Sequence, residues 1–125
     1  MPTILVVDDE ALVRRTLRIQ LEKVGFTFIE AEDGRAAVEI AAAKDIDIAL
    51  VDILMPNMDG IELIRALRIR RPALPIVAMS GGGRLEASDM LDVAAKLGAD
   101  ITIAKPVGAK DIMKAINDLL AARNR

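Results

Sequence analysis

Polar residues that could bind a metal ion or a phosphoryl group follow four short apolar runs in this chain of 125 residues. Asp8 and Asp9 follow the run 4–7, Asp52 follows 48–51, Ser80 follows 76–79, and Lys105 with Pro106 follows 101–104. If the runs are parallel strands of one sheet, their polar ends meet at the same edge, where ligands bind in open α/β sheets. The spacing therefore predicts one pocket that holds carboxylates, a hydroxyl and an ammonium group.

Such a set of groups is suited to phosphoryl transfer. Carboxylates that lie close together repel one another unless a cation intervenes, and Mg²⁺ prefers one or two carboxylates together with waters and phosphate oxygens. Lys105 offers a point charge for a phosphate oxygen, and Ser80 offers a hydrogen-bond donor. A carboxylate can also attack phosphorus to give an acyl phosphate. We expect Asp52 to be this nucleophile because it stands alone, whereas Asp8 and Asp9 form a pair suited to the metal.

The elements that must position these groups alternate along the sequence. The four runs are almost continuously apolar, as in strands that are covered on both faces. The segment 27–31 alternates more and is typical of an edge strand. Segments with helical spacing lie between and after the strands, at 13–24, 37–44, 61–68, 90–97 and 112–120. Five βα units predict a doubly wound parallel sheet, and in the flavodoxin-like order 2-1-3-4-5 the switch point falls between the first and third strands.

The composition excludes several other chemistries. The chain has no cysteine, histidine, tryptophan or tyrosine, so Ser-His-Asp catalysis, zinc sites of the usual kind and aromatic platforms for bases are ruled out. A formal net charge of -2 argues against direct nucleic-acid binding. The N-terminal residues do not show the pattern of a secretory signal, and no apolar run in the sequence is long enough to cross a membrane. We expect a cytoplasmic protein with one domain over 1–125.

Each polar residue also has a simpler structural interpretation. Asp8 and Asp9 could cap the first helix, and Asp52 could be a turn residue before Pro56. Ser80 could belong to an ordinary loop, and Lys105 could mark the exit of a surface strand. These interpretations explain the residues one at a time. They do not explain why every strand except the expected edge strand at 27–31 ends in a group suited to the same chemistry.

Taken together, the motifs resemble the receiver domain of two-component response regulators. The resemblance extends over the whole chain and rests on several segments in the same order and spacing. They are Asp8 with Asp9, the stretch 52–60, Ser80 with Gly81, the stretch 98–100, and Lys105 with Pro106. It implies that Asp52 accepts a phosphoryl group from a phosphohistidine on a histidine kinase or a histidine phosphotransfer protein. The chain would then be a regulatory phosphoacceptor rather than an enzyme.

The resemblance also implies roles for individual residues. Asp9, Asp52 and the main-chain carbonyl of Leu54 would bind Mg²⁺ directly, and Asp8 would assist through a water molecule. Lys105 would contact the phosphoryl group, and Ser80 would move to donate a hydrogen bond to it. Pro106 would follow Lys105 through a cis peptide bond, which proline tolerates better than other residues.

The chain departs from the family pattern at three places. Thr102 occupies the position of the usual aromatic switch residue, so the coupled movement of hydroxyl and ring cannot operate in its usual form. Val107 stands where the family often has phenylalanine. The glycines at 81–83 predict a long, mobile connection into the fourth helix. Leu54 and Gly82 flank the expected path of an attacking water, so we expect them to influence the lifetime of the phosphoryl group.

Several alternatives stay open at the level of sequence. The domain could be a stand-alone regulator, a phosphorelay intermediate or the receiver part of a longer regulator, and a monomer or a weak dimer. Its output would be a downstream protein that recognises the fourth helix, fifth strand and fifth helix. A phosphotransferase of the haloacid-dehalogenase kind is less favoured because Asp8 and Asp9 are adjacent rather than two residues apart. An electron carrier of flavodoxin type would need a phosphate-binding loop after the first strand.

Overall fold

Strands and helices alternate along the chain, as the sequence predicts. The computed structural model describes residues 2–53, 60–80, 98–104 and 109–123. The strands are β1 (Thr3–Val7), β2 (Thr27–Ala31), β3 (Ile48–Asp52), β4 (Ile76–Ser80) and β5 (Ile101–Ala104). The helices in the described ranges are α1 (Ala11–Lys23), α2 (Gly34–Ala43), α3 (Gly60–Arg70) and α5 (Ala109–Arg123). The five predicted strands are confirmed, and the fourth helix expected at 90–97 lies outside the described residues.

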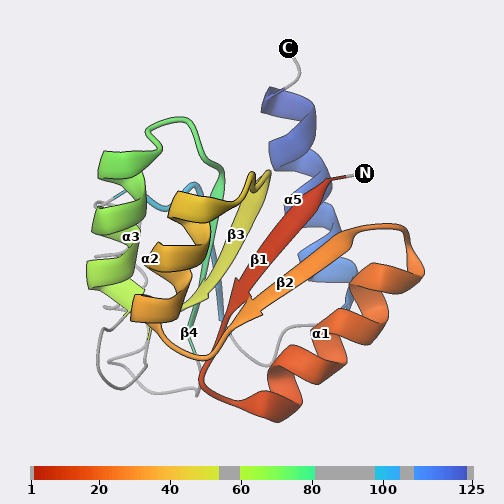
Figure 1. Ribbon diagram of the computed structural model, residues 1–125. Coiled ribbons are helices and arrows are strands. Elements are labelled where there is room, and N and C mark those ends of the chain that lie inside the picture. The colour runs from red at the N-terminus through yellow and green to blue at the C-terminus, as the bar shows by residue number, and fades with distance from the viewer. Residues whose placement is uncertain (1, 54–59, 81–97, 105–108, 124–125) are drawn as a thin grey trace.

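The strands form one parallel sheet in the order β2-β1-β3-β4-β5, which confirms the predicted doubly wound fold. β2 lies at one edge, in agreement with its weaker apolar pattern. In Figure 1, α2 and α3 lie on one face of the sheet, while α1 and α5 lie on the other. The switch point therefore falls between β1 and β3, where the carboxyl ends of the two strands lie side by side.

Alternation of side chains along each strand divides the interior into two cores. On β1, Leu5 and Val7 pack with residues of α2 and α3, whereas Ile4 and Val6 pack with residues of α1 and α5. All four of these strand side chains are fully buried. Because the sheet contributes to both cores, displacing a central strand would disturb the packing on both of its faces.

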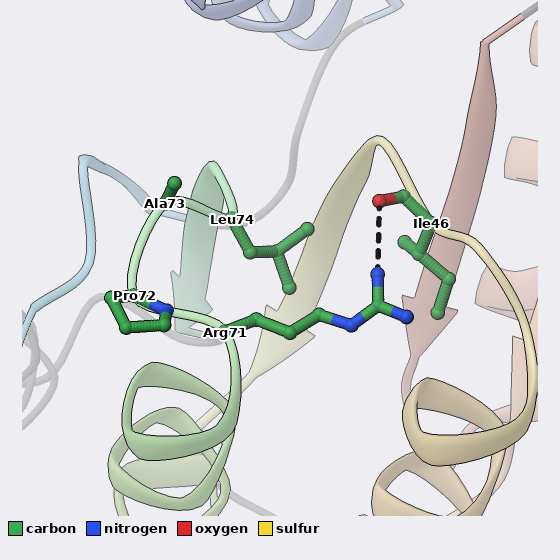
Figure 2. A pocket seen from close by; sticks show the side chains of 5 residues that line it. All are labelled: Ile46, Arg71, Pro72, Ala73 and Leu74. Atoms are coloured by element: carbon green, nitrogen blue, oxygen red, sulfur yellow. Dashed lines mark hydrogen bonds between the residues drawn. The ribbon is translucent and has the colours of Figure 1, made fainter.

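A surface pocket lies at the amino ends of β3 and β4, far from the edge that carries Asp52. It is lined by Ile46, Arg71, Pro72, Ala73 and Leu74 (Figure 2). The Arg71 guanidinium donates to the carbonyl oxygens of Ile46 at 3.4 Å and Lys44 at 2.7 Å. The pocket is therefore a junction between connecting segments and not part of the acidic edge. Among the described residues, no helix combines the length and the apolar character needed to cross a bilayer.

Candidate functional site

Two buried carboxylates mark the carboxyl ends of the neighbouring strands β1 and β3. Val7 is aligned with Val51, so Asp8 follows β1 at the level where Asp52 ends β3. The exposed fraction is 0% for Asp8 and 3% for Asp52. Burial of a charged group is costly unless the group is paired or hydrogen-bonded. The fold thus brings these two predicted site residues to the switch point and withdraws them from bulk water.

Asp8 also begins a short acidic turn that leads into α1. One carboxylate oxygen from each of Asp8, Asp9 and Glu10 lies within 4.8 Å of the other two, with Asp8 buried and the other two residues exposed. The backbone N–H of Glu10 donates to Oδ1 of Asp8 at 2.9 Å. Glu10 is the N-cap residue of α1 and makes no side-chain capping bond. Asp8 thus accepts the N–H of the N-cap residue itself, within the turn that precedes the helix.

The acidic turn differs in one respect from the predicted ligand set. Glu10 was not among the expected ligands, yet its carboxylate lies in the same group as Asp8 and Asp9. The signal was present in the sequence as three consecutive acidic residues. Oxygen donors of this kind fit a hard cation such as Mg²⁺. Asp52 stands outside this group although it is buried next to Asp8, and Leu54 lies outside the described residues.

The backbone of Asp52 is held in place from α3. The N–H of Gly60, the first residue of α3, donates to the carbonyl oxygen of Ile53 at 3.1 Å. A Cβ at position 60 would lie 2.2 Å from Cα of Ile53 and 2.5 Å from the carbonyl oxygen of Asp52. On the other side, the N–H of Ile53 donates to the carbonyl oxygen of Met79 at 2.9 Å. Only glycine permits this approach of the helix to the strand end.

Of the remaining predicted residues, the structure describes some and not others. Ser80 ends β4, where its backbone is aligned with Ala104 of β5. Thr102 lies on β5 opposite Ala78 and is half-buried. Lys105 and Pro106 lie outside the described residues, as do Val107 and the glycines at 81–83. The described site thus consists of the acidic turn, Asp52 and the end of β4.

Comparison with known proteins agrees with this arrangement. The sequence pattern of the response regulator receiver domain matches residues 4–117. The chain therefore belongs to the response regulator receiver domain family. Membership supports a role in phosphorylation-dependent signalling and disfavours the phosphotransferase and electron-carrier alternatives.

The curated relatives are longer proteins with different outputs. The chain is 38% identical over 117 residues to the transcriptional regulatory protein ResD of Bacillus subtilis, covering 94% of this chain and 47% of ResD. It is 32% identical over 123 residues to a cyclic di-GMP phosphodiesterase of Thermotoga maritima, covering 98% of this chain and 32% of that protein. The chain thus spans less than half the length of these two relatives, and their whole-protein activities are not transferred to it.

Solved structures show the same fold. A CheY-like receiver domain from Methanospirillum hungatei matches with a TM-score of 0.90 at 27% identity, covering 99% of this chain and 97% of that one. A receiver domain from Clostridium thermocellum matches with a TM-score of 0.91 at 27% identity, covering 99% and 98%. These structures agree with the doubly wound parallel sheet expected from the sequence.

Proposed function

We propose that this protein is a phosphoacceptor that receives a phosphoryl group on Asp52 in a Mg²⁺-dependent reaction. The observation that carries the proposal is the burial of Asp8 and Asp52 at the same level of two neighbouring strands at the switch point, with the exposed carboxylates of Asp9 and Glu10 beside Asp8. One buried carboxylate lies at the end of a strand, and the other belongs to a turn rich in oxygen donors. This division fits a nucleophile beside a metal site.

The proposed step transfers the phosphoryl group between two proteins. A carboxylate oxygen of Asp52 attacks phosphorus of a phosphohistidine on a histidine kinase or a histidine phosphotransfer protein. The new bond is O–P, the N–P bond breaks, and its electron pair returns to the imidazole nitrogen. Later attack by water on phosphorus releases inorganic phosphate and restores the carboxylate.

The other residues would neutralise and orient the transferring group. Asp9, Asp52 and the Leu54 carbonyl would hold Mg²⁺, with Asp8 acting through water. The cation would offset negative charge on the phosphoryl oxygens. Lys105 would supply a second positive charge, and Ser80 would donate a hydrogen bond to the phosphoryl group. Glu10 belongs to the same acidic turn as Asp8 and Asp9, so its carboxylate would add to the negative charge that attracts Mg²⁺.

The proposed role is regulatory rather than enzymatic, and we place it in the cytoplasm. Phosphorylation of Asp52 would change the surface around the fourth helix, β5 and α5, and a downstream protein would recognise it. Thr102 would transmit the change through a small displacement of β5. This displacement would be smaller than the movement of an aromatic side chain at the same position. The protein itself would make no direct contact with nucleic acid or membrane.

Intact mass spectrometry tests this proposal. The protein is incubated with a small phosphodonor, with and without Mg²⁺, and then weighed. We expect an adduct with the mass of one phosphoryl group in the wild type with Mg²⁺ and none in Asp52→Asn. The exposed carboxylate of Asp45 provides the matched control, because Asp45→Asn should leave the adduct unchanged. An adduct of equal yield in Asp52→Asn would remove Asp52 as the acceptor.

A further inference from the structure

Arg14 of α1 contacts both ends of the acidic turn. Its Nη1 donates to the carbonyl oxygen of Asp8 at 2.6 Å, and its backbone N–H donates to the carbonyl oxygen of Glu10 at 3.2 Å. The Arg14 side chain is only 12% exposed. A positive charge that is largely shielded from water is thus hydrogen-bonded to the backbone of the turn that carries three carboxylates, which repel one another unless a cation intervenes.

The guanidinium of Arg14 is itself anchored to the neighbouring strand. Nε of Arg14 lies 3.0 Å from Oε1 of Glu30 on β2. The other oxygen of Glu30 lies 3.1 Å from Nη1 of Arg18, which also stacks over the ring of Phe28. Glu30 therefore holds two arginines one helical turn apart. Of the two, only Arg14 has a described hydrogen bond to the acidic turn.

We propose that Arg14 is a positioning residue for the Mg²⁺ site, an inference that rests on the proposed function. By fixing the carbonyl of Asp8, Arg14 fixes the peptide plane between Asp8 and Asp9. The orientation of that peptide sets the directions in which the side chains of Asp8 and Asp9 leave the backbone. It therefore sets where their carboxylate oxygens can bind a cation. Outer-shell partners that orient ligands in this way typically change metal affinity about 10–100-fold when they are removed.

Two effects of removing Arg14 oppose each other. Loss of a positive charge would by itself make the turn more attractive to Mg²⁺, while loss of the hydrogen bond to Asp8 would make it less ordered. Arg14 contacts the turn through the carbonyl oxygen of Asp8, and the effective dielectric near a protein surface weakens the action of its charge on a bound cation. The ordering effect should therefore dominate, and Mg²⁺ binding should weaken.

Titration of the metal-free protein with MgCl₂, followed by amide chemical shifts in ¹⁵N NMR, tests the proposal. In Arg14→Met, which keeps most of the aliphatic stem, we expect the Mg²⁺ dissociation constant to rise about tenfold. Arg18→Met is the matched control, because it also removes a partner of Glu30 and has no described bond to the turn. Its dissociation constant should stay within about twofold of wild type, well below the change expected for loss of a ligand-orienting partner.

The inference is overturned if Arg14→Met binds Mg²⁺ as tightly as wild type, or more tightly, or if Arg18→Met weakens binding equally. If Arg14→Met does not fold, Glu30→Gln replaces it. That variant keeps the size of residue 30 but loses its charge, and Mg²⁺ binding should weaken about threefold, less than for the full loss of Arg14. Unchanged binding in Glu30→Gln then contradicts the inference. Failure of the wild type to bind Mg²⁺ would instead overturn the proposed function, and the inference with it.

Discussion

Asp8 and Asp52 are both buried carboxylates, but their surroundings differ. Asp8 belongs to a turn whose next two residues are exposed acids, and its Oδ1 accepts the N–H of Glu10. Asp52 ends β3 and is packed against the start of α3. The first setting gathers oxygen donors of the kind that suit a hard cation. The second fixes one carboxylate on a rigid strand, as a nucleophile requires.

Gly60 provides a prediction at the residue scale. In Gly60→Ala the new methyl group would overlap the backbone of Asp52 and Ile53, so the end of β3 must shift. Overpacking of this kind costs about 1–3 kcal/mol of the free energy of unfolding. We also expect phosphorylation of the remaining folded protein to slow about tenfold, since small displacements of a reacting group are costly.

Urea unfolding measures the first effect, and the initial rate of adduct formation by mass spectrometry measures the second. A variant that is destabilised but phosphorylated at the wild-type rate would show that Gly60 serves packing alone.

The positions of site residues were predictable where they depended only on residue type and on order along the chain. The positions of Asp8 and Asp52 followed from runs of apolar residues and a topological rule. The close approach of Gly60 to Asp52 and the reach of Arg14 to the carbonyl of Asp8 were not predicted. Each contact joins a helix to the end of a strand, and no local pattern in the sequence predicts it.

At the scale of elements, Arg68 joins the end of α3 to the starts of β4 and β5. Its guanidinium donates to the carbonyl oxygens of Pro72 and Leu74, both at 2.7 Å, and to the carbonyl of Gly98. It also pairs with Asp100 at 3.1 Å, and Asp100 in turn accepts the N–H of Ile76 at 2.8 Å. One side chain thus satisfies several backbone groups at the edge of the sheet opposite to the site.

Loss of this junction should destabilise the fold without changing the site. Hydrogen bonds to charged groups contribute about 1.5–3 kcal/mol each, and they are not additive, so we expect Arg68→Met to lose about 2–3 kcal/mol of the free energy of unfolding. The exposed Arg70 in the same turn provides the control, and Arg70→Met should change stability by less than about 0.5 kcal/mol. Equal stability of the two variants in urea unfolding would contradict this account.

The elements themselves were well predicted because the two periodicities are distinct. Short apolar runs marked the strands, and the stronger alternation at 27–31 correctly placed β2 at an edge. The structure extends β3 and β4 by one residue to include Asp52 and Ser80. Strand ends depend on backbone pairing with neighbours, which the apolar pattern does not contain.

For the whole molecule, the shared sheet implies a single cooperative unit. Neighbouring residues of β1 contribute to opposite cores, so neither core can be lost while the other stays intact. We expect one calorimetric transition whose calorimetric and van't Hoff enthalpies agree. Mg²⁺ at about 100 times its dissociation constant should stabilise the folded state by about 2.7 kcal/mol.

Differential scanning calorimetry with and without Mg²⁺ checks both expectations. Two resolved transitions would contradict the single unit. A transition temperature independent of Mg²⁺ would contradict binding to the folded state.

The similarity to solved receiver domains concerns the fold of the whole molecule. A TM-score of 0.90 at 27% identity means that the fold depends on the pattern of apolar and polar positions more than on particular residues. Relatives with 94–98% of this chain matched carry it within a transcriptional regulator and a phosphodiesterase. Segments similar to this chain thus occur in longer proteins of different kinds.

Chemical trapping identifies the residue that carries the phosphoryl group. The protein is phosphorylated with a small phosphodonor and Mg²⁺ and then treated with borohydride, which reduces an acyl phosphate on aspartate to homoserine. Tandem mass spectrometry locates the modified residue. If Asp52 is the phosphoacceptor, homoserine will be found at position 52 alone, and only when Mg²⁺ was present. Homoserine at position 8 or 9, or none at position 52 in protein shown to carry the adduct, would contradict this assignment.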